Sequence, residues 1–378
     1  MTAVAERHYL KLISKDRISG LGVTRHGYAL PTQIVPILES GHPIPDEGGL
    51  TAANRALEFA QSATKNDLVL VLLSGAASSN LLAPLDAIRF AEKQQTTRAL
   101  LRSGASIREI NIVRKHLSRI KGGRLAVAAY PAKVVTLAFS DVPNDDPEFI
   151  GAGPTLPDST TLADARAVLE RYGIRVPDAV SFALSNQANE TPKSNHPAFN
   201  SASFKLLARP SDSLDAVEAF VLGRGCECIR LGSDIEGEAR TVAESHANIA
   251  LELARDKRRA VIISGGELTV TVRGHGRGGP NQEYALGLAI ALRGAPGISA
   301  VAANTDGVDG GAGSSTDPAG AFIDESTLSR AASKRLAPEE YLNNNDTANF
   351  FAALDDLLIT GPTFTNVNDF RAILIDPP

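Results

Sequence analysis

Several aspartates lie directly after apolar stretches of the chain, where carboxylates can do chemistry. Asp306 and Asp309 stand in "TDGVDGGAGSSTD", right after the apolar run "ISAVAAN". Asp141, Asp145 and Asp146 follow a second run of this kind, "KVVTLAFS". Carboxylates at the end of a strand can hold Mg²⁺, which keeps several waters and bridges phosphate groups. Asp is also common in turns that carry no function, and this alternative stands for each of the five.

Two Ser-Gly stretches also follow apolar runs, in "LVLVLLSGAASSN" and in "AVIISGGELTVTV". A turn of this kind after a strand can bring backbone N–H groups close to an anionic ligand. The alternative for each is a tight turn with a helix cap. The candidate ligand-binding residues in the two stretches are Ser74, Gly75, Ser78, Ser79, Asn80, Gly265, Gly266 and Glu267.

The stretch "RGHGRGGPNQEYALGLAIALRG" combines glycines with one central arginine and the start of a helix. Gly274, Gly276 and Gly279 satisfy the G-x-G-x-x-G spacing of dinucleotide-binding loops, and Pro280 suits a first helical turn. The preceding run alternates apolar and polar residues, unlike a central Rossmann strand, and the acid expected after the fingerprint is misplaced. Arg277 instead favours a loop that neutralises carboxylate or phosphate oxygens, with a solvated loop cation as the alternative. The candidate binding residues here are Gly278, Gly279, Asn281 and Gln282.

A polar loop near the C-terminus separates two apolar runs in "LLITGPTFTNVNDFRAILI". Residues 361–369 are denser in hydroxyl and amide side chains than a simple turn requires, so Thr363 and Asn366 are candidate ligand contacts. No G-x-S-x-G elbow and no G-x-x-x-x-G-K-[ST] loop occurs, which disfavours a serine hydrolase and a P-loop nucleotide site.

The elements that must position these residues alternate between short apolar strands and helices. Runs at 68–74, 133–140, 260–264 and 298–304 are apolar, as parallel strands buried on both faces are. A helix is expected from a capping box of Ser106 and Glu109 to a stop at Gly122 and Gly123, with cations in its last turn. The pattern predicts an α/β protein with largely parallel sheets.

The polar segment 185–203, rich in Asn, Ser and Pro, interrupts this alternation. Such a composition predicts an interdomain linker or a long surface loop. The chain has 378 residues, enough for more than one domain. We therefore expect two α/β domains, an N-terminal Rossmann-like domain over residues 1–190 and a second domain over residues 201–378.

The composition disfavours several classes of partner. The net charge is −5 and the chain has no Trp, so neither nucleic acid nor a membrane surface is an expected partner. No apolar run is long enough to span a bilayer, and no secretory signal is visible. Cys226 and Cys228, the two cysteines, lie one residue apart and suit reduced thiols in a cytoplasmic protein.

The quoted stretches resemble the glycerate 2-kinase family, whose members are often labelled hydroxypyruvate reductase and whose C-terminal part is called the MOFRL domain. The similarity runs from about Arg17 to the C-terminus. It is carried in order by "INIVRKHLSRIKGGRLA", "SDVPNDDPEFIGAGPTLPDSTT", "SGGELTVTVRGHGRGGPNQE", "TDGVDG" and "LLITGPTFTNVND". The resemblance implies two α/β domains with an active site in the cleft between them. It also implies ATP-dependent phosphorylation of D-glycerate at its 2-hydroxyl, with Mg²⁺.

Under this resemblance, Arg277 and Lys121 are the cations expected near the anionic groups. Asp306 or Asp309 would hold Mg²⁺ or the substrate hydroxyl, and Ser74, Ser78 and Asn80 would orient the ligand. Two departures bear on these roles. Ser-Gly-Ala-Ala-Ser at 74–78 replaces the family's Ser-Gly-Gly-Gly-Ser, and Pro280 stands where the family often has arginine, so Arg277 would have to serve.

Two other functions stay open at the level of the sequence. An oxidoreductase acting on hydroxypyruvate would need a nicotinamide site, for which only the compromised glycine fingerprint is available. A non-catalytic relative that senses glycerate or nucleotide would keep the same residues without turnover. The oligomeric state is also open, with a homodimer as one option.

The family's strand ending in Gly-Lys-Ala, expected before the helix that begins in "MTAVAERHYL", has no counterpart in the 378 residues. Its lysine would neutralise the transferring phosphate, and its strand would cover a sheet edge. We therefore expect weak kinase activity and marginal solubility from these residues alone, and recovery of both in a form that begins further upstream.

Overall fold

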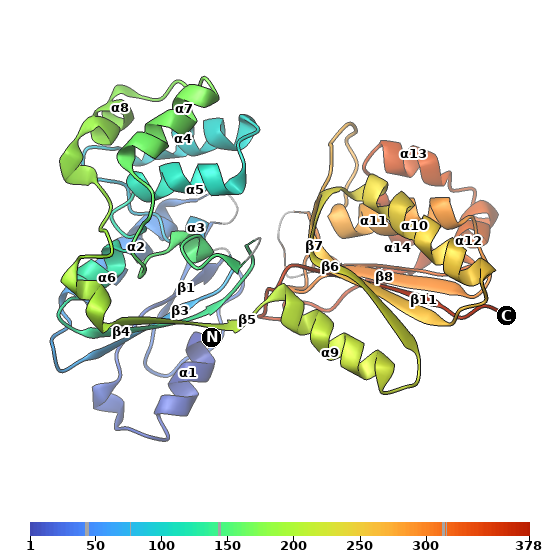
Figure 1. Cartoon of the computed structure of the whole chain (residues 1–378), viewed down its shortest axis with the longest axis horizontal. Coiled ribbons are helices and arrows are strands. Elements are labelled where there is room, and N and C mark those ends of the chain that lie inside the picture. The colour runs from blue at the N-terminus through green and yellow to red at the C-terminus, as the bar shows by residue number, and fades with distance from the viewer. Residues whose placement is uncertain (42–44, 76, 143–144, 312–313, 315) are drawn as a thin grey trace. The chain divides into compact units, whose positions relative to one another are not determined.

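The computed structural model divides the chain into two compact units, Met1–Leu207 and Ala208–Pro378 (Figure 1). It describes residues 1–41, 45–75, 77–142, 145–311, 314 and 316–378. Each unit has its own sheets and its own buried apolar clusters. Within the described residues, no helix has the length and apolar character that a bilayer crossing requires.

Unit 1 contains two small sheets. The strands β1 (Gly22–Arg25) and β2 (Ile37–Ser40) pair in parallel, and so do β3 (Leu68–Leu73) and β4 (Lys133–Phe139). The strand β5 (Ala202–Ala208) lies beside β4. The helices are α1 (Thr2–Tyr9), α2 (Glu47–Gln61), α3 (Ala77–Asn80), α4 (Phe90–Arg102), α5 (Ile107–His116), α6 (Arg124–Ala129), α7 (Leu162–Arg171) and α8 (Asp178–Ser185). Short 3-10 helices are η1 (Lys15–Arg17), η3 (Ile150–Ala152), η4 (Gln187–Asn189) and η5 (Pro197–Ser201).

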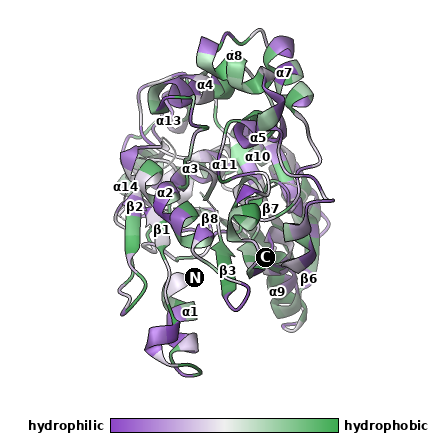
Figure 2. Ribbon diagram, turned by 90° about the vertical axis from the view of Figure 1, so that its left-hand side faces the viewer, coloured by the Kyte–Doolittle hydropathy of each residue, from purple (hydrophilic) through white to green (hydrophobic). Residues whose placement is uncertain are grey.

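The helices of unit 1 are amphipathic, and they bury their apolar sides in two places. Helices α2 and α5 each carry hydrophobic and hydrophilic residues along their length (Figure 2). One cluster lies among α4, α5, α7 and α8, which form a helical layer in Figure 1. The other lies where α2 and α6 pack near β3 and β4. Buried side chains of α5 therefore pack against α4, α7 and α8, whereas β3 and β4 pack against α2 and α6.

The predicted helix around residue 110 is confirmed in its start and is wrong in its end. Ser106 Oγ accepts a hydrogen bond from Glu109 N at 3.3 Å, and Glu109 Oε2 accepts one from Ser106 N at 3.0 Å. Helix α5 stops at His116, because Leu117 leaves helical geometry with φ −105° and ψ 18°. Leu117 and Ile120 stay buried in a turn, so the apolar stripe continues where the helix does not.

Unit 2 is built on one six-stranded sheet of order β10-β9-β8-β11-β7-β6. Only β6 and β7 pair in parallel among these neighbours, because β11 inserts antiparallel between β7 and β8. Helices α10 and α11 bury the largest apolar cluster against this sheet. The strands are β6 (Glu227–Glu238), β7 (Ala260–Thr269), β8 (Ile298–Asn304), β9 (Gly320–Ile323), β10 (Leu357–Leu358) and β11 (Asp369–Ile375). The helices are α9 (Pro210–Leu222), α10 (Ala239–Arg255), α11 (Pro280–Leu292), α12 (Thr327–Ser333), α13 (Pro338–Asn343) and α14 (Thr347–Leu354).

The α/β class that the sequence predicts is confirmed. The expected parallel pairing is found for β1–β2, β3–β4 and β6–β7, and β11 makes the sheet of unit 2 mixed. The segment 185–203, expected as a linker, belongs to unit 1, where it forms η4 and η5 and leads into β5. The division between the units falls after Leu207, past the boundary that its polar composition suggested.

The second Ser-Gly stretch is not the turn that the sequence predicts. Residues 264–267 continue β7, and Gly266 pairs with Asp369 of β11 and with Ile235 of β6. Gly266 has φ +105°, and a Cβ placed there would lie 2.2 Å from the Ile235 carbonyl oxygen. Glycine in this strand therefore permits the close approach of a bulged neighbour, and it is not needed to form a ligand-binding turn.

We predict that Gly266→Ala destabilises the protein by about 2–4 kcal/mol, because the new Cβ meets backbone atoms at a strained φ. Urea unfolding measures this change. The matched control is Gly225→Ala, where φ is +71° but no heavy atom lies within 4 Å. This control should lose only about 1–2 kcal/mol, from backbone strain alone. Equal losses in both variants would contradict the close-approach argument.

Candidate functional site

The carboxyl ends of β3 and β4 lie side by side in unit 1, which is where open parallel sheets place their ligands. After β3, the chain passes through Ser74 and Gly75 into the short helix α3, and Ala77 N donates to Ser74 O at 3.4 Å. The 3-10 helix η3 packs against α3, since a Cβ on Gly151 would lie 3.2 Å from Ala77 Cβ. This end of the sheet is therefore lined by α3 and η3.

The turn that follows α5 brings Lys121 to the same place. Arg119 N donates to Ala83 O at 2.8 Å and Leu85 N donates to Leu117 O at 3.3 Å, so residues 117–119 run antiparallel to residues 83–85. Beyond Lys121, the N–H groups of the two glycines at 122 and 123 donate to the carbonyl oxygens of residue 152, the last residue of η3, and of residue 153, which follows it. Lys121 thus comes from a turn that is bonded on one side to residues 83–85, which follow α3, and on the other side to the end of η3.

Lys121 and Asn80 are both buried, and each has a polar atom without a partner among the described residues. Lys121 is only 2% exposed, and its Nζ makes no hydrogen bond to any of them. Asn80 is 6% exposed, and its Oδ1 also lacks a donor. Burial lowers the pKa of Lys121 to about 7, and repulsion from the Arg114 guanidinium acts in the same direction. Leaving such groups unsatisfied costs free energy, so this arrangement suits a ligand with an anionic group for Lys121 and a hydrogen-bond donor for Asn80.

Two further cations close to Lys121, Lys93 and Arg114, were not predicted from the sequence. Lys93 lies on α4, 2% exposed, and its Nζ donates to the Arg114 carbonyl oxygen at 3.3 Å. Burial lowers the pKa of Lys93 well below its ordinary value, and the charges of Lys121, Arg114 and Arg124 add to the effect. A signal was available: Lys93 occupies the same helix face as Thr97 and Leu100, which are buried.

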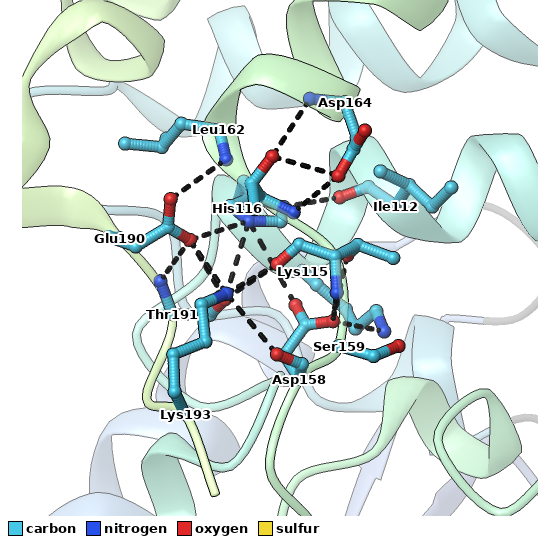
Figure 3. Close-up of polar contacts among 12 residues, drawn as sticks. Ile112, Lys115, His116, Asp158, Ser159, Leu162, Asp164, Glu190, Thr191 and Lys193 are labelled. Atoms are coloured by element: carbon cyan, nitrogen blue, oxygen red, sulfur yellow. Dashed lines mark hydrogen bonds and ion pairs between the residues drawn. The ribbon is translucent and has the colours of Figure 1, made fainter. Parts of the chain in front are cut away.

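A buried polar network supports the segment that carries Lys121 (Figure 3). Lys115 Nζ donates to Asp158 Oδ1 at 2.7 Å, and both side chains are fully buried. Burial alone would raise the pKa of Asp158, but the ion pair with Lys115 and hydrogen bonds from Thr160 bring it below the ordinary value. Beside this pair, His116 Nε2 lies 3.2 Å from Glu190 Oε1.

The network reaches the Lys121 turn at Gly122. With φ +58°, Gly122 leaves no room for a side chain, because a Cβ would lie 3.0 Å from Thr191 Cγ2 and 3.2 Å from Asp158 Oδ2. Figure 3 shows Thr191, Asp158 and Lys115 converging from separate segments. The position of Lys121 therefore depends on contacts that residues 158–193 supply.

In unit 2, the predicted residues Asp309, Asn281 and Gln282 form a separate buried cluster. The Asp309 carboxylate accepts hydrogen bonds from the backbone N–H groups of Asn281 and Gln282 at 2.9 and 2.8 Å. Their side-chain amides donate to the same carboxylate at 3.0 and 3.1 Å. Burial raises the pKa of Asp309 to about 6, the neighbouring Asp369 charge adds to this, and the N–H donors oppose it. Asp309 thus satisfies the first turn of α11, which begins at Pro280 as predicted.

Asp306 and the C-terminal polar loop meet near the end of β8. Asp306 O accepts a hydrogen bond from Thr363 N at 3.2 Å, and Asp306 Oδ1 accepts one from Val308 N at 2.8 Å. Asn366 Oδ1 accepts a hydrogen bond from Asn368 N at 2.9 Å within the loop. Asp306 is partly buried and Thr363 is exposed, so this loop keeps Asp306 closer to solvent than Asp309.

The glycine-rich loop at 273–279 uses its N–H groups inside the protein. Arg273 N and Gly274 N donate to Asn345 Oδ1 at 2.7 and 3.0 Å, and Arg277 N donates to Asp346 Oδ1 at 2.9 Å. His275 N and Gly276 N donate to the side chain and the carbonyl oxygen at position 344. A dinucleotide fingerprint needs such donors free for the pyrophosphate. The Arg277 side chain is exposed, with no hydrogen bond or ion pair to the described residues.

The candidate residues therefore fall into two groups in the two units. In unit 1, Ser74, Gly75, Ser78 and Asn80 lie in α3 or directly before it, Lys121 lies in the turn bonded to residues 83 and 85 and to residues 152 and 153, and the side chain of Ser79 lies outside what the structure describes. Unit 2 holds the remaining candidates. Gly265 and Gly266 lie inside β7, Glu267 is exposed on it, and Gly278 and Gly279 pack closely against Thr347 and Asp309.

The two predicted Mg²⁺ ligands differ in how well they fit a metal. Four N–H donors occupy the buried Asp309 carboxylate, which leaves little room for a cation. Asp306 is more accessible and remains the better candidate. No group of three or more His, Cys, Asp or Glu residues suited to a metal occurs in the described part of the chain. A Mg²⁺ ion held by one carboxylate, waters and phosphate oxygens is compatible with this arrangement.

Comparison with known proteins decides the family. Residues 1–185 match a domain of unknown function, DUF4147, and residues 260–369 match the MOFRL family. A putative hydroxypyruvate reductase of Agrobacterium vitis is 47% identical over 365 residues, which cover 95% of this chain and 81% of that protein. The D-glycerate 2-kinase of Thermotoga maritima is 41% identical over 370 residues, which cover 97% of this chain and 86% of the relative. The chain belongs to the glycerate 2-kinase family.

The fold agrees with this membership. A crystal structure of the glycerate kinase of Thermotoga maritima superposes with a TM-score of 0.83 at 41% identity, covering 94% of this chain and 85% of that one. The resemblance to the glycerate 2-kinase family that the sequence motifs carry is thereby confirmed.

We predict that Lys121→Met raises the stability of the ligand-free protein at pH 7 by about 1–3 kcal/mol, because it removes a buried cation without a partner. The pKa of Lys121 is lowered from 10.5 to about 7 by folding, so the unfolded state binds more protons between these values. Wild-type stability should therefore rise with pH from about 7 to 10, and the variant should lose this rise. Urea unfolding across this pH range measures both effects.

Lys65→Met, at an exposed position of unit 1, is the matched control and should change neither stability nor its pH dependence. If Lys121→Met lowers stability at pH 7 instead, then the lysine has a structural partner, and its assignment to a ligand site is contradicted.

Proposed function

We propose that this protein is a kinase that transfers the γ-phosphoryl group of ATP to the 2-hydroxyl of D-glycerate. The observation that carries the proposal is the buried, unpartnered Lys121 at the carboxyl end of β3, in a member of the glycerate 2-kinase family. Phosphoryl transfer needs positioned cations more than covalent chemistry, since the transition state is stabilised mainly by electrostatics. The D-glycerate 2-kinase of Thermotoga maritima supports the same reaction through its similarity over most of the chain.

The proposed roles follow from charge and burial. Lys121 would neutralise an anionic group of the substrates, and Asn80 Oδ1 would accept a hydrogen bond from a ligand hydroxyl or amine. Mg²⁺, when bound with ATP, would neutralise charge on the phosphates. Arg277 has an exposed guanidinium free to reach a carboxylate or phosphate, and we keep it as a second candidate cation. The proposed setting is the cytoplasm, where thiols such as the free Cys226 and Cys228 stay reduced.

Hydroxypyruvate reduction is the second candidate, because a relative from Agrobacterium vitis carries that name. Such a reaction requires a nicotinamide dinucleotide. The N–H groups of residues 273–277, in the stretch that has the G-x-G-x-x-G spacing, are bonded to Asn344, Asn345 and Asp346. This geometry supports the kinase over the reductase.

Two assays on the purified chain separate the candidates. With D-glycerate and MgATP, we expect slow release of ADP and 2-phosphoglycerate in equal amounts, detected by coupled assay and by ³¹P NMR. With hydroxypyruvate and NADH or NADPH, we expect no loss of nicotinamide absorbance above the enzyme-free rate. Reductase turnover without ADP release would reverse the proposal, and saturable binding of glycerate without either reaction would indicate a sensor.

The two aspartates of unit 2 should respond differently to substitution. Asp306→Asn should raise the Mg²⁺ concentration needed for half-maximal rate, because a neutral amide is a poorer ligand for a hard cation. Asp309→Asn should instead lower stability by about 2–4 kcal/mol, since an amide group cannot accept all four N–H donors of Asn281 and Gln282. A Mg²⁺ titration and urea unfolding on both variants test this contrast. A wild-type Mg²⁺ profile for Asp306→Asn would remove it from the metal site.

A further inference from the structure

Three cations of unit 1 lie together without an ion pair. Lys93, Arg114 and Lys121, called the cation triad below, form no salt bridge with any described residue. The polar contacts of the triad's side chains are two long ones, Lys93 Nζ to the Arg114 carbonyl oxygen at 3.3 Å and Arg114 Nη1 to Asn111 Oδ1 at 3.4 Å. Lys121 Nζ has none.

The members of the triad are close enough to repel one another. The Lys93–Arg114 contact joins α4 to α5, and Lys121 lies in the turn that follows α5. The pKa of Lys93 is lowered by burial and by the charges of Lys121 and Arg114, and that of Lys121 by burial and by Arg114. Burial also lowers the pKa of Arg114. Three basic groups from three segments therefore share one region, where each disfavours the charged form of the others, and an anion bound there would favour their protonated forms.

Two other buried cations of unit 1 have an ion pair or several hydrogen bonds, in contrast to the triad. Lys115 pairs with Asp158 at 2.7 Å. Arg124 donates to the carbonyl oxygens of Lys115, Ser118 and Asn189 at 3.0, 2.7 and 2.6 Å. A protein fold that pairs these groups but leaves three neighbours unpaired carries a large desolvation cost at the triad. An anion that binds there would offset this cost.

The number of charges narrows the class of anion. When all three groups are protonated, a carboxylate such as that of glycerate carries one negative charge and would leave most of the triad's positive charge unmatched. A phosphate group carries about 1.5 to 2 negative charges near pH 7 and offers three acceptor oxygens, and a polyphosphate carries more. We propose that Lys93, Arg114 and Lys121 together bind a phosphate-bearing anion, and not the carboxylate of the acceptor substrate. This inference rests on the proposed kinase function for the source of the phosphate, which is either the nucleotide or the phosphorylated product.

Binding can be tested without turnover. Isothermal titration calorimetry at constant ionic strength would compare inorganic tripolyphosphate, 2-phosphoglycerate and D-glycerate, with acetate as the singly charged control. We expect one saturable site for at least one phosphate compound. D-glycerate and acetate should be at least roughly tenfold weaker in the triad region, because they engage fewer charge-assisted contacts. Tripolyphosphate stronger than 2-phosphoglycerate assigns the site to the nucleotide, and the reverse order assigns it to the product.

Variants of the triad connect this binding to named residues. Lys93→Met and Lys121→Met should each weaken phosphate binding by about tenfold or more, whereas Lys65→Met should leave it unchanged. Lys93→Arg keeps the charge and should retain most of the affinity, which separates loss of charge from loss of folding. Circular dichroism and urea unfolding confirm that each variant is folded.

The outcomes distinguish this inference from the proposed function. Tight phosphate binding that depends on Lys93 and Lys121, in a chain that does not phosphorylate glycerate, supports the site and contradicts the kinase. Kinase activity with phosphate binding unchanged in both variants overturns the site and leaves the kinase. Equal affinity for acetate and tripolyphosphate, or no saturable phosphate binding at all, also overturns the inference.

Discussion

Burying an amine away from water without a counter-ion costs free energy, and Lys121 bears this cost at the end of β3. The surrounding structure of unit 1 holds the backbone at Lys121 so that its side chain stays buried. Helix α5 ends early at His116, the following turn is tied to residues 83–85, and two glycines then allow close contact with η3. A flexible lysine could otherwise extend to solvent, as most lysines do. Binding of an anionic ligand would offset this desolvation cost.

The network around Lys115 and Asp158 serves the same end. A fully buried ion pair contributes little net stability by itself, but breaking it would leave a charge in the protein interior. Such a pair therefore fixes geometry more than it adds stability. Through Gly122, which has no space for a side chain beside Asp158 and Thr191, the network holds the turn that carries Lys121. In this region, the buried network therefore adds little to the free energy of unfolding and mainly fixes the position of Lys121.

In unit 2, backbone N–H groups that the sequence suggested for ligand binding are hydrogen-bonded within the protein. Asp309 accepts the first N–H groups of α11, and Asn344, Asn345 and Asp346 accept those of the glycine-rich loop. Both arrangements satisfy the orphan donors that precede and begin a helix. A Cβ added at Gly274 would lie 2.3 Å from the Asn344 carbonyl oxygen, and one added at Gly276 would lie 2.3 Å from Asp346 Cβ. The loop therefore requires glycine at both positions. The G-x-G-x-x-G spacing here therefore reflects packing, and a nicotinamide role loses its structural basis.

The amino-acid sequence alone determined the α/β class, the strands at 68–73, 133–139 and 298–304, the capping box at Ser106 and the start of α11. These features depend on neighbours along the chain, so local patterns identify them. The order of long motifs also indicated the family. Only the tertiary structure decided that β11 inserts between β7 and β8, that the Ser-Gly stretch at 264–266 stays inside a strand, and that α5 ends at His116. It also decided that Lys93, Arg114 and Lys121 lie near one another and form no salt bridge with the described residues, because burial and charge pairing depend on which distant segments fold against each residue.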